Sequence, residues 1–289
     1  MSYKSVFTVK FAEISVRFKF PSIVKIPEKF AGFLCEDNKQ PDEEYEIQLL
    51  NQPLCFEEPP ITSYNGMKIY RHNKQWIRVY SQLVAEDGCQ VACSSKKNGK
   101  RVLYYPASKW EFYSKELHFL HLIGIEEVLL KQQAMMLHSS VVLLNDQTVL
   151  FSGPSGAGKS TQASLWREFL DAEVINGDRC IIRKIEEVFY GCGSLWSGTS
   201  GIYRQENAPI KGIFLLKQSE ENTVRRVHAE AFAKIYSQCV VNAWDSGFIE
   251  KMTDLIVELL EQVPVYELSC RPDEDAVHIA YKILFEEGC

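Results

Sequence analysis

The feature that most constrains the fold is a glycine-rich segment, VLFSGPSGAGKSTQASLW, at residues 149–166. Residues 153–160 within it match the pattern G-x-x-x-x-G-K-[ST] in full. An apolar strand pattern, residues 149–151, precedes the match, and a helix-forming run, residues 160–170, follows it. A phosphate-binding loop requires this strand–loop–helix order, so the sequence predicts a nucleotide-binding site here.

Each part of this loop has a predicted role. The glycines allow tight turns and close backbone approach, so that backbone N–H groups form a cradle for phosphate oxygens at the start of a helix. Lys159 is expected to contact the β- and γ-phosphates, and the Ser160 hydroxyl to bind Mg²⁺. A glycine-rich turn without a ligand is the alternative, but it does not require Lys-Ser at these positions. The predicted nucleotide-binding residues are Gly153, Ser155, Gly156, Ala157, Gly158, Lys159, Ser160 and Thr161.

Composition excludes several other classes. The 289 residues are 46% apolar, which suffices for one large or two modest domains. A net charge of −6 argues against a general nucleic-acid binder, because such proteins need basic surface to displace counterions. No apolar window is long enough to predict a membrane span, and the alternating start is unlike a signal peptide.

The cysteines point to a reducing compartment. Their number is nine, and an odd count without a secretory signal favours free thiols and a cytoplasmic location. Cys89 and Cys93 form a lone C-x3-C pair. A zinc site needs a second pair at ligand spacing, and the sequence has none, so these two residues are interpreted as ordinary thiols.

Two parts of different character are expected along the chain. Residues 1–110 form a predicted β-rich N-terminal region, whose role the sequence does not decide, and residues 111–289 form the predicted nucleotide-binding domain. In the first part, alternating apolar and polar residues predict half-buried strands at residues 5–10, 13–20, 66–71, 75–80 and 101–105.

Charge and periodicity lead to predictions for the intervening segments. Residues 36–60 are rich in acidic side chains and indicate a solvated loop, with a partner-binding patch as the alternative. Residues 94–101, SSKKNGKR, indicate a solvated basic turn. Residues 115–135 predict one continuous helix with an apolar face. Strand and helix patterns alternate from His138 onwards, which is typical of an α/β domain. Within this part, Asn145-Asp146 is the expected turn of a hairpin ahead of the glycine-rich loop.

A specific order of residues surrounds the loop. His138 lies 15 residues before Gly153, and Asp178-Arg179 follow an apolar stretch about twenty residues after the loop. Trp196-Ser197-Gly198 and an apolar strand from Ala208 come next. In this order the sequence resembles the HPr kinase/phosphorylase family and its kinase-like relatives, which share a core with phosphoenolpyruvate carboxykinases. The resemblance covers roughly residue 118 to the C-terminus.

The resemblance implies a mixed α/β fold with a phosphoenolpyruvate carboxykinase-like P-loop core, and ATP and Mg²⁺ as cofactors. It further implies that Asp178 takes the proton from an attacking seryl hydroxyl and contacts the metal together with Ser160. A hydroxyl is a poor nucleophile, and a carboxylate after a strand can face the crevice that the loop borders, so physical chemistry supports this role. A turn or capping Asp before a strand at residues 180–184 is the alternative.

The second predicted catalytic residue is His138. It is expected either to orient Asp178 or to sense γ-phosphate charge, and a satisfied histidine at a strand start is the alternative. Arg179 and Arg204 are candidates for stabilising transition-state charge, with surface ion pairs as the alternative.

The sequence also departs from the family. Gly177 replaces the first of two acidic residues, and residues 193–201 contain no carboxylate where the family has a metal-binding Glu. We therefore expect a kinase acting on a hydroxyl of another peptide, protein or small molecule. The alternative is a nucleotide-binding regulatory module without transfer activity. A carboxykinase-type lyase would need a transition-metal site with Lys and His ligands. The sequence shows no such cluster, so this class is not expected. Neither a nucleic-acid nor a membrane partner is expected, and a homo-oligomer and the choice between ATP and GTP stay open.

Overall fold

The computed structural model describes residues 3–26, 28–36, 40–52, 54–64, 66–80, 91–94, 100–114 and 122–287. Backbone contacts divide the chain into two compact units, Met1–Ile125 and Glu126–Cys289. Each unit contains its own large sheet with parallel and antiparallel pairs, so the fold is mixed α/β. The division falls after Ile125, whereas the sequence places the boundary after residue 110.

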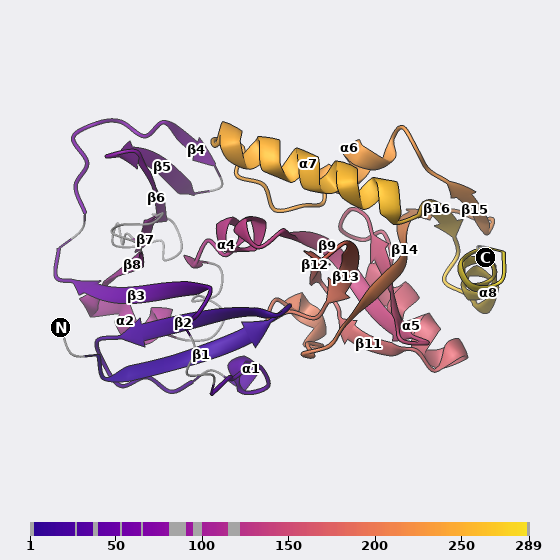
Figure 1. Ribbon diagram of the computed structural model, residues 1–289, viewed down its shortest axis with the longest axis horizontal. Coiled ribbons are helices and arrows are strands. Elements are labelled where there is room, and N and C mark those ends of the chain that lie inside the picture. Colours follow the sequence, from indigo (N-terminus) through magenta and orange to yellow (C-terminus); the bar gives the residue numbers. More distant parts are fainter. Residues whose placement is uncertain are drawn as a thin grey trace. The chain divides into compact units, whose positions relative to one another are not determined.

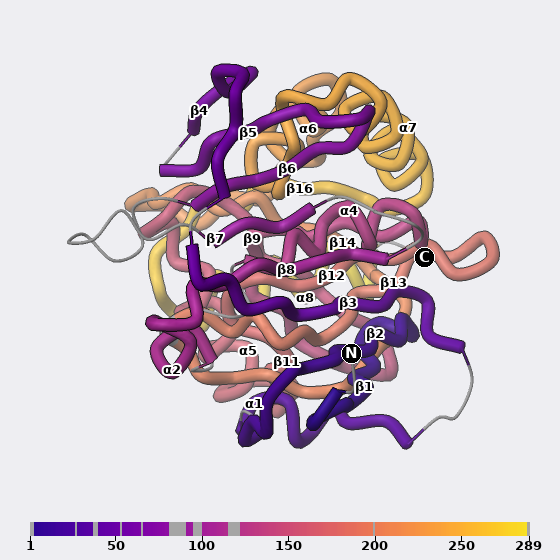
Figure 2. Tube along the Cα trace, turned by 90° about the vertical axis from the view of Figure 1, so that its left-hand side faces the viewer, coloured from indigo at the N-terminus to yellow at the C-terminus, as the bar shows by residue number. Residues whose placement is uncertain are grey.

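A single mixed sheet dominates the N-terminal unit. Its strands follow the order β1-β2-β3-β8-β7-β6-β5-β4 across the sheet (Figure 2). All five strands predicted in this region are present, and the described residues also form β3, β4 and β7, of which β4 and β7 are short. The strands are β1 Ser5–Phe11, β2 Ile14–Phe20, β3 Glu43–Leu50, β4 Thr62–Tyr64, β5 Met67–His72, β6 Gln75–Tyr80, β7 Val91–Ser94 and β8 Arg101–Pro106. The short helices are α1 Glu28–Ala31, the 3₁₀ turn η1 Ala107–Lys109 and α2 Trp110–Tyr113.

The prediction of a solvated loop at residues 36–60 is wrong for its middle, because β3 lies there and pairs in parallel with β2 and β8. Buried and half-buried residues alternate at the start of β3, and Tyr45 and Ile47 are fully buried. The acidic side chains between them made the segment resemble a loop in the sequence. Glu43 is also buried, beside the buried Arg101 at 3.5 Å. Residues 95–99 of the predicted basic turn lie outside the described residues.

The predicted helix over residues 115–135 is also wrong where the structure describes it. Leu122 and α4, Glu126–Lys131, are helical there, with a break at residues 123–125 between them, and residues 115–121 lie outside the described residues. Gly124, just before α4, has φ +59°, and Gln133, just after it, has φ +53°. A left-handed residue interrupts a right-handed helix, so a continuous helix cannot run through either position. The apolar run that follows therefore forms a long buried strand, β9 Ala134–Leu144.

The sheet of the second unit carries the glycine-rich loop. Two long strands, β9 and β14, each pair with different neighbours along their two halves. At its carboxyl half β14 lies in parallel between β10 and β16, and β9 and β10 form the predicted hairpin through Asn145 and Asp146, both with positive φ. Two left-handed residues give the turn type that tight hairpins favour. The further strands are β10 Gln147–Ser152, β11 Glu173–Asn176, β12 Arg179–Ile185, β13 Val188–Cys192, β14 Asn207–Gln218, β15 Thr223–Arg226 and β16 Val265–Cys270.

Helices cover both faces of this sheet. Alternate residues of the central strands point to opposite sides: Leu150 and Ile213 to one core, Phe151 and Phe214 to the other. The first core also contains side chains of α4, α6 and α7, and the second contains those of α5 and α8; Figure 1 shows α7 and α5 on opposite sides of the strands. The helices are α5 Lys159–Leu170, α6 Ala231–Tyr236, α7 Ser246–Gln262 and α8 Glu274–Phe285, with a 3₁₀ turn η2 at Gly198–Ser200.

The helices give no indication of a membrane segment. Among those in the described part of the chain, none combines the length and the apolar composition needed to span a bilayer.

Candidate functional site

The glycine-rich loop connects the end of β10 to the start of α5. Gly156 has φ +81° and Gly158, immediately before the helix, has φ +100°. Residues with side chains rarely adopt these angles, so the glycines are what allow the chain to turn from the strand into the helix. No side chain caps this helix end. Its first backbone N–H groups are therefore not bonded to a capping side chain. N–H groups at such a helix start, next to a glycine-rich loop, commonly bind anions.

Lys159 lies inside this loop, with only 8% of its surface exposed. Its Nζ donates hydrogen bonds to the carbonyl oxygens of Gly153, at 2.9 Å, and Pro154, at 3.0 Å. Burial lowers the pKa of Lys159, and the negative charge of Asp178 acts in the opposite direction. The ammonium group is thus held at the loop by carbonyl dipoles that a phosphate can replace.

Asp178 is paired with His138. The distance between His138 Nε2 and Asp178 Oδ1 is 3.2 Å, and both side chains are 30% exposed. The hydrogen bond from His138 is the largest cause that lowers the pKa of Asp178; the charges of Arg179 and Lys159 add to it, and burial opposes it. Asp178 is therefore ionised at neutral pH and lies within the electrostatic influence of the loop lysine.

His138 is in the middle of β9, not at a strand start as one alternative supposed. Its backbone carbonyl accepts a hydrogen bond from Ser152 Oγ at 3.0 Å, and Ser152 is the residue immediately before Gly153. The backbone carbonyl of Asp178 accepts from the N–H of Ser139, the next residue in β9. These two contacts tie both members of the His–Asp pair to the start of the loop.

A set of fully buried polar residues that sequence reasoning missed supports Asp178. Asn176 Oδ1 accepts a hydrogen bond from the Asp178 N–H at 3.1 Å, and Asn176 Nδ2 donates to Ser194 and to the Trp196 carbonyl. Ser140 Oγ donates to the Gly177 carbonyl at 3.1 Å. Asn176 and Ser140 are completely buried. The sequence signal was present, since polar residues interrupt strands that are otherwise apolar.

The Trp196-Ser197-Gly198 segment and Ser200 pack tightly around this turn. A Cβ atom at position 198 would lie 2.6 Å from Cγ of Asp178, and Gly198 has φ +54°. A Cβ atom at position 177 would collide with the side chain of Ser200. The glycines at 177 and 198 therefore let the backbone lie against Asp178, and the space for a carboxylate at 177 is occupied by Ser200.

The two candidate arginines have different surroundings. Arg179 Nε lies 3.7 Å from Asp178 Oδ2, so this side chain is at the site. Arg204 forms an ion pair with Glu173, and its side chain is 52% exposed. Arg204 thus matches the alternative of a surface ion pair.

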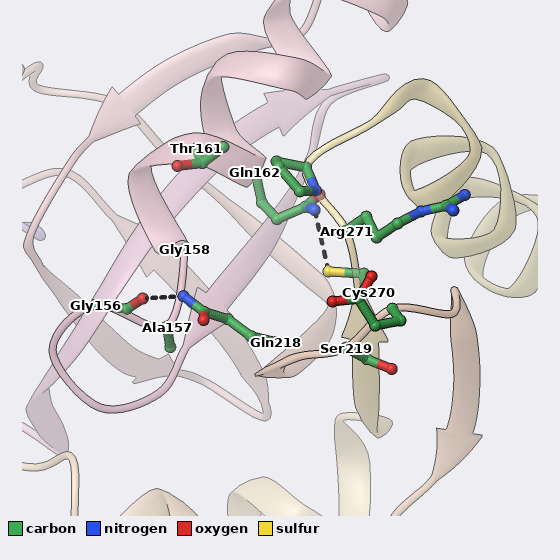
Figure 3. A pocket seen from close by; sticks show the side chains of 11 residues that line it. Gly156, Ala157, Gly158, Thr161, Gln162, Gln218, Ser219, Cys270 and Arg271 are labelled. Atoms are coloured by element: carbon green, nitrogen blue, oxygen red, sulfur yellow. Dashed lines mark hydrogen bonds between the residues drawn. The ribbon is translucent and has the colours of Figure 1, made fainter.

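An open pocket of about 750 Å³ borders the other side of the loop (Figure 3). It lies where β10, β14 and β16 reach their carboxyl ends, the edge at which ligands bind in open α/β sheets. Gln218 Nε2 donates to the Gly156 carbonyl at 2.8 Å and so joins the end of β14 to the loop. Thr161 and Gln162 contribute from α5. Cys270 and Arg271 lie opposite.

The predicted metal-binding residues provide oxygen ligands. The Ser160 hydroxyl is exposed at the start of α5, and Asp178 has a partly exposed, ionised carboxylate. Mg²⁺ prefers oxygen ligands and is usually held by one or two protein groups together with phosphate oxygens and water. The donor set fits this pattern. A metal site formed by protein ligands alone is not found, because no cluster of three or more His, Cys, Asp or Glu able to hold a metal occurs among the described residues.

Comparisons with known proteins give little guidance. No protein-family model matches the chain, and no curated protein is significantly similar to it. Among solved structures, the chain is similar to the HPr(Ser) kinase/phosphatase from Coxiella burnetii, with a TM-score of 0.30 and 10% sequence identity. The similarity covers 51% of this chain and 93% of that chain. A similarity at this level carries no information about activity.

Proposed function

We propose that this protein is an ATP-dependent kinase that transfers the γ-phosphoryl group to a hydroxyl of a peptide, protein or small molecule. A seryl hydroxyl is the first candidate, and the reaction is HPr kinase-like without being that of a true HPr kinase/phosphorylase. The observation that carries the proposal is that the His138–Asp178 pair is tied through Ser152 to the start of the glycine-rich loop that holds Lys159.

Binding of the triphosphate is the first step. The loop N–H groups and the start of α5 attract phosphate oxygens, and Lys159 exchanges the carbonyls of Gly153 and Pro154 for the β- and γ-phosphates. Ser160 and Asp178 would hold Mg²⁺, which would offset the negative charge of the phosphate oxygens. The buried Lys159 reaches the phosphate without a large desolvation change, because it is already removed from water in the free protein.

Transfer then requires a base beside the phosphate. The acceptor oxygen forms a bond to the γ-phosphorus, the bond to the β–γ bridging oxygen breaks, and ADP leaves. The acceptor proton passes to the Asp178 carboxylate and from there to solvent. A carboxylate of lowered pKa is a weak base, but it is ionised at neutral pH, and phosphoryl transfer depends mainly on position and charge.

A nucleotide-binding regulatory module is the second candidate function. Gly177 favours it, because Ser200 occupies the space in which a second carboxylate would have to lie. Such a module would keep the loop and Lys159 but would not transfer phosphate.

A single-turnover assay separates the two candidates. Protein in excess is mixed with γ-labelled Mg·ATP and a panel of seryl peptides and small hydroxyl compounds, and label is followed into acceptor and phosphate. A kinase transfers label with the wild-type chain and not with Lys159→Ala. A regulatory module retains ATP without transferring label to any acceptor, water included.

A further inference from the structure

The pocket beside the loop contains a buried amide with an unused hydrogen-bonding atom. Gln162 is in the first turn of α5, and only 2% of it is exposed. Its Nε2 donates to Cys270 Sγ at 3.3 Å, the contact drawn in Figure 3. Its Oε1 is buried and has no hydrogen-bond partner among the described residues. An unsatisfied buried carbonyl is costly, so its presence in a pocket needs an explanation.

The carboxamide has a defined pattern of unused groups. An amide NH₂ has two donor hydrogens, and the bond to Cys270 uses one of them. One N–H and the Oε1 acceptor are left without a partner among the described residues, on a side chain that lines the pocket. The neighbouring polar groups are engaged elsewhere: Gln218 bonds to Gly156, and Arg271 Nε bonds to Asp273 at 2.9 Å. In Figure 3 the guanidinium of Arg271 points away from Gln162.

A donor and an acceptor side by side match the edge of adenine that carries N6–H and N7. Guanine presents two acceptors, O6 and N7, on the same edge, so Gln162 Oε1 would face an acceptor there. The pocket volume of about 750 Å³ is in the range of nucleotide-sized ligand sites. The pocket is also lined by Gly156, Ala157 and Gly158, so a nucleotide held by the loop can extend directly into it.

We infer that this pocket holds the nucleoside of the bound nucleotide and that Gln162 recognises its adenine base, giving a preference for ATP over GTP. The inference rests on the proposed binding of a triphosphate at the loop, and it adds a residue that the loop pattern does not contain. Cys270 positions the amide by accepting its other N–H.

Trp166 provides a structural alternative. Its indole Nε1 is also buried without a partner among the described residues, one helical turn beyond Gln162. A rotated carboxamide could accept a hydrogen bond from it. In that case Gln162 would stabilise the helix packing and would have no part in base selection.

The test compares three ligands on the full chain. Titration calorimetry measures the affinities of Mg·ATP, Mg·GTP and magnesium tripolyphosphate, which occupies the loop but has no nucleoside, for wild type and Gln162→Met. Methionine keeps the length and helix propensity of glutamine and removes its polar atoms. We expect the wild type to prefer ATP over GTP by roughly 5–150-fold and Gln162→Met to lose that preference. The affinity for tripolyphosphate should change less than about twofold, whereas the control Lys159→Ala should weaken all three ligands.

The outcomes separate the inference from the function on which it rests. If tripolyphosphate binds the wild type but ATP binds no more tightly, or if Gln162→Met leaves the ratio of ATP to GTP affinity unchanged, the inference is wrong and the loop site stands. Lower stability of Gln162→Met with an unchanged ratio identifies the Trp166 alternative. If neither ATP nor tripolyphosphate binds the wild type, the proposed function fails and the inference with it.

Alkylation of Cys270 in the wild type provides a test that needs no variant. Burial raises the pKa of this half-buried thiol, so the reaction is run at mildly alkaline pH and read by mass spectrometry. ATP should protect Cys270 and tripolyphosphate should not, while the exposed Cys55 in the other unit serves as an internal control. Equal alkylation rates of Cys270 with and without saturating ATP would overturn the inference.

Discussion

The side chains of His138 and Asp178 meet at 3.2 Å, between Nε2 of the imidazole and Oδ1 of the carboxylate. They come from β9 and from the turn between β11 and β12, so only the folded sheet brings them together. The contact is the largest cause of the lowered pKa of Asp178, and Lys159 also acts on this carboxylate. A pH-dependent property of the site should therefore change when the histidine is removed.

His138→Ala should raise the pKa of Asp178, because the hydrogen bond that lowers it most is lost while burial, which raises it, remains. In the proposed reaction only the ionised carboxylate is active, so activity falls as the pH drops through this pKa. The acid limb of the pH–rate profile should thus move to higher pH in His138→Ala. An unmoved acid limb, with or without a lower rate, would mean that His138 does not control Asp178.

Lys159→Ala should weaken Mg·ATP binding by about 1.5–3 kcal/mol, the usual loss for a charge-assisted hydrogen bond to phosphate. The loop residues that Lys159 contacts belong to neither a helix nor a strand, so the circular dichroism spectrum should stay unchanged. Titration calorimetry on both proteins is the measurement. Equal affinities would remove Lys159 from the nucleotide site.

Gly177→Ala should lower the free energy of unfolding by about 1–3 kcal/mol, because the new Cβ collides with the Ser200 side chain. The double variant Gly177→Ala/Ser200→Gly removes the colliding atoms and should recover much of the loss. Urea unfolding of the wild type, both single variants and the double variant gives the coupling between the two positions. Additive effects would show that Ser200 does not limit the side chain at 177.

The unit Glu126–Cys289 should fold and bind Mg·ATP without the preceding residues, because the loop, Asp178, His138 and the two cores described above all lie within it. Expression of this fragment and an ATP titration check the prediction. Aggregation of the fragment beside soluble full-length protein would show that the N-terminal unit completes its core.

The sequence predicted those parts of the molecule that depend on neighbouring residues. The loop, the helix after it and the β9–β10 hairpin are local, and each has strong glycine or Asn-Asp turn signals. Strand β3 was missed because its acidic side chains suggested a loop, although Tyr45 and Ile47, on the buried face, alternate with the half-buried Glu44 and Glu46.

Long-range contacts were not predictable in this way. Gln162 and Cys270 are 108 residues apart, and Asn176 supports Asp178 through Ser194 and Trp196 across a loop. These residues have no characteristic spacing, and only the pairing of distant strands brings them together. The predicted roles of His138, Asp178 and Ser160 stay predictions, although the structure brings His138 and Asp178 into contact.

The most direct test of the proposed function compares wild type with Asp178→Asn in single-turnover transfer of γ-phosphate from labelled Mg·ATP. Water can serve as acceptor, so the natural acceptor need not be known. Asparagine keeps the shape of the carboxylate but cannot take a proton, and transfer should fall by roughly 10²–10⁴-fold. If Asp178 acts as the base alone, the affinity for Mg·ATP should change far less, because Lys159 and the loop remain. If Asp178 also holds Mg²⁺, the affinity for Mg·ATP should fall together with the rate, and the Mg²⁺ dependence should shift. Equal rates and equal affinities in the two proteins would contradict a catalytic role for Asp178 and leave it a structural residue, and no transfer by the wild type to water or any acceptor would contradict the kinase.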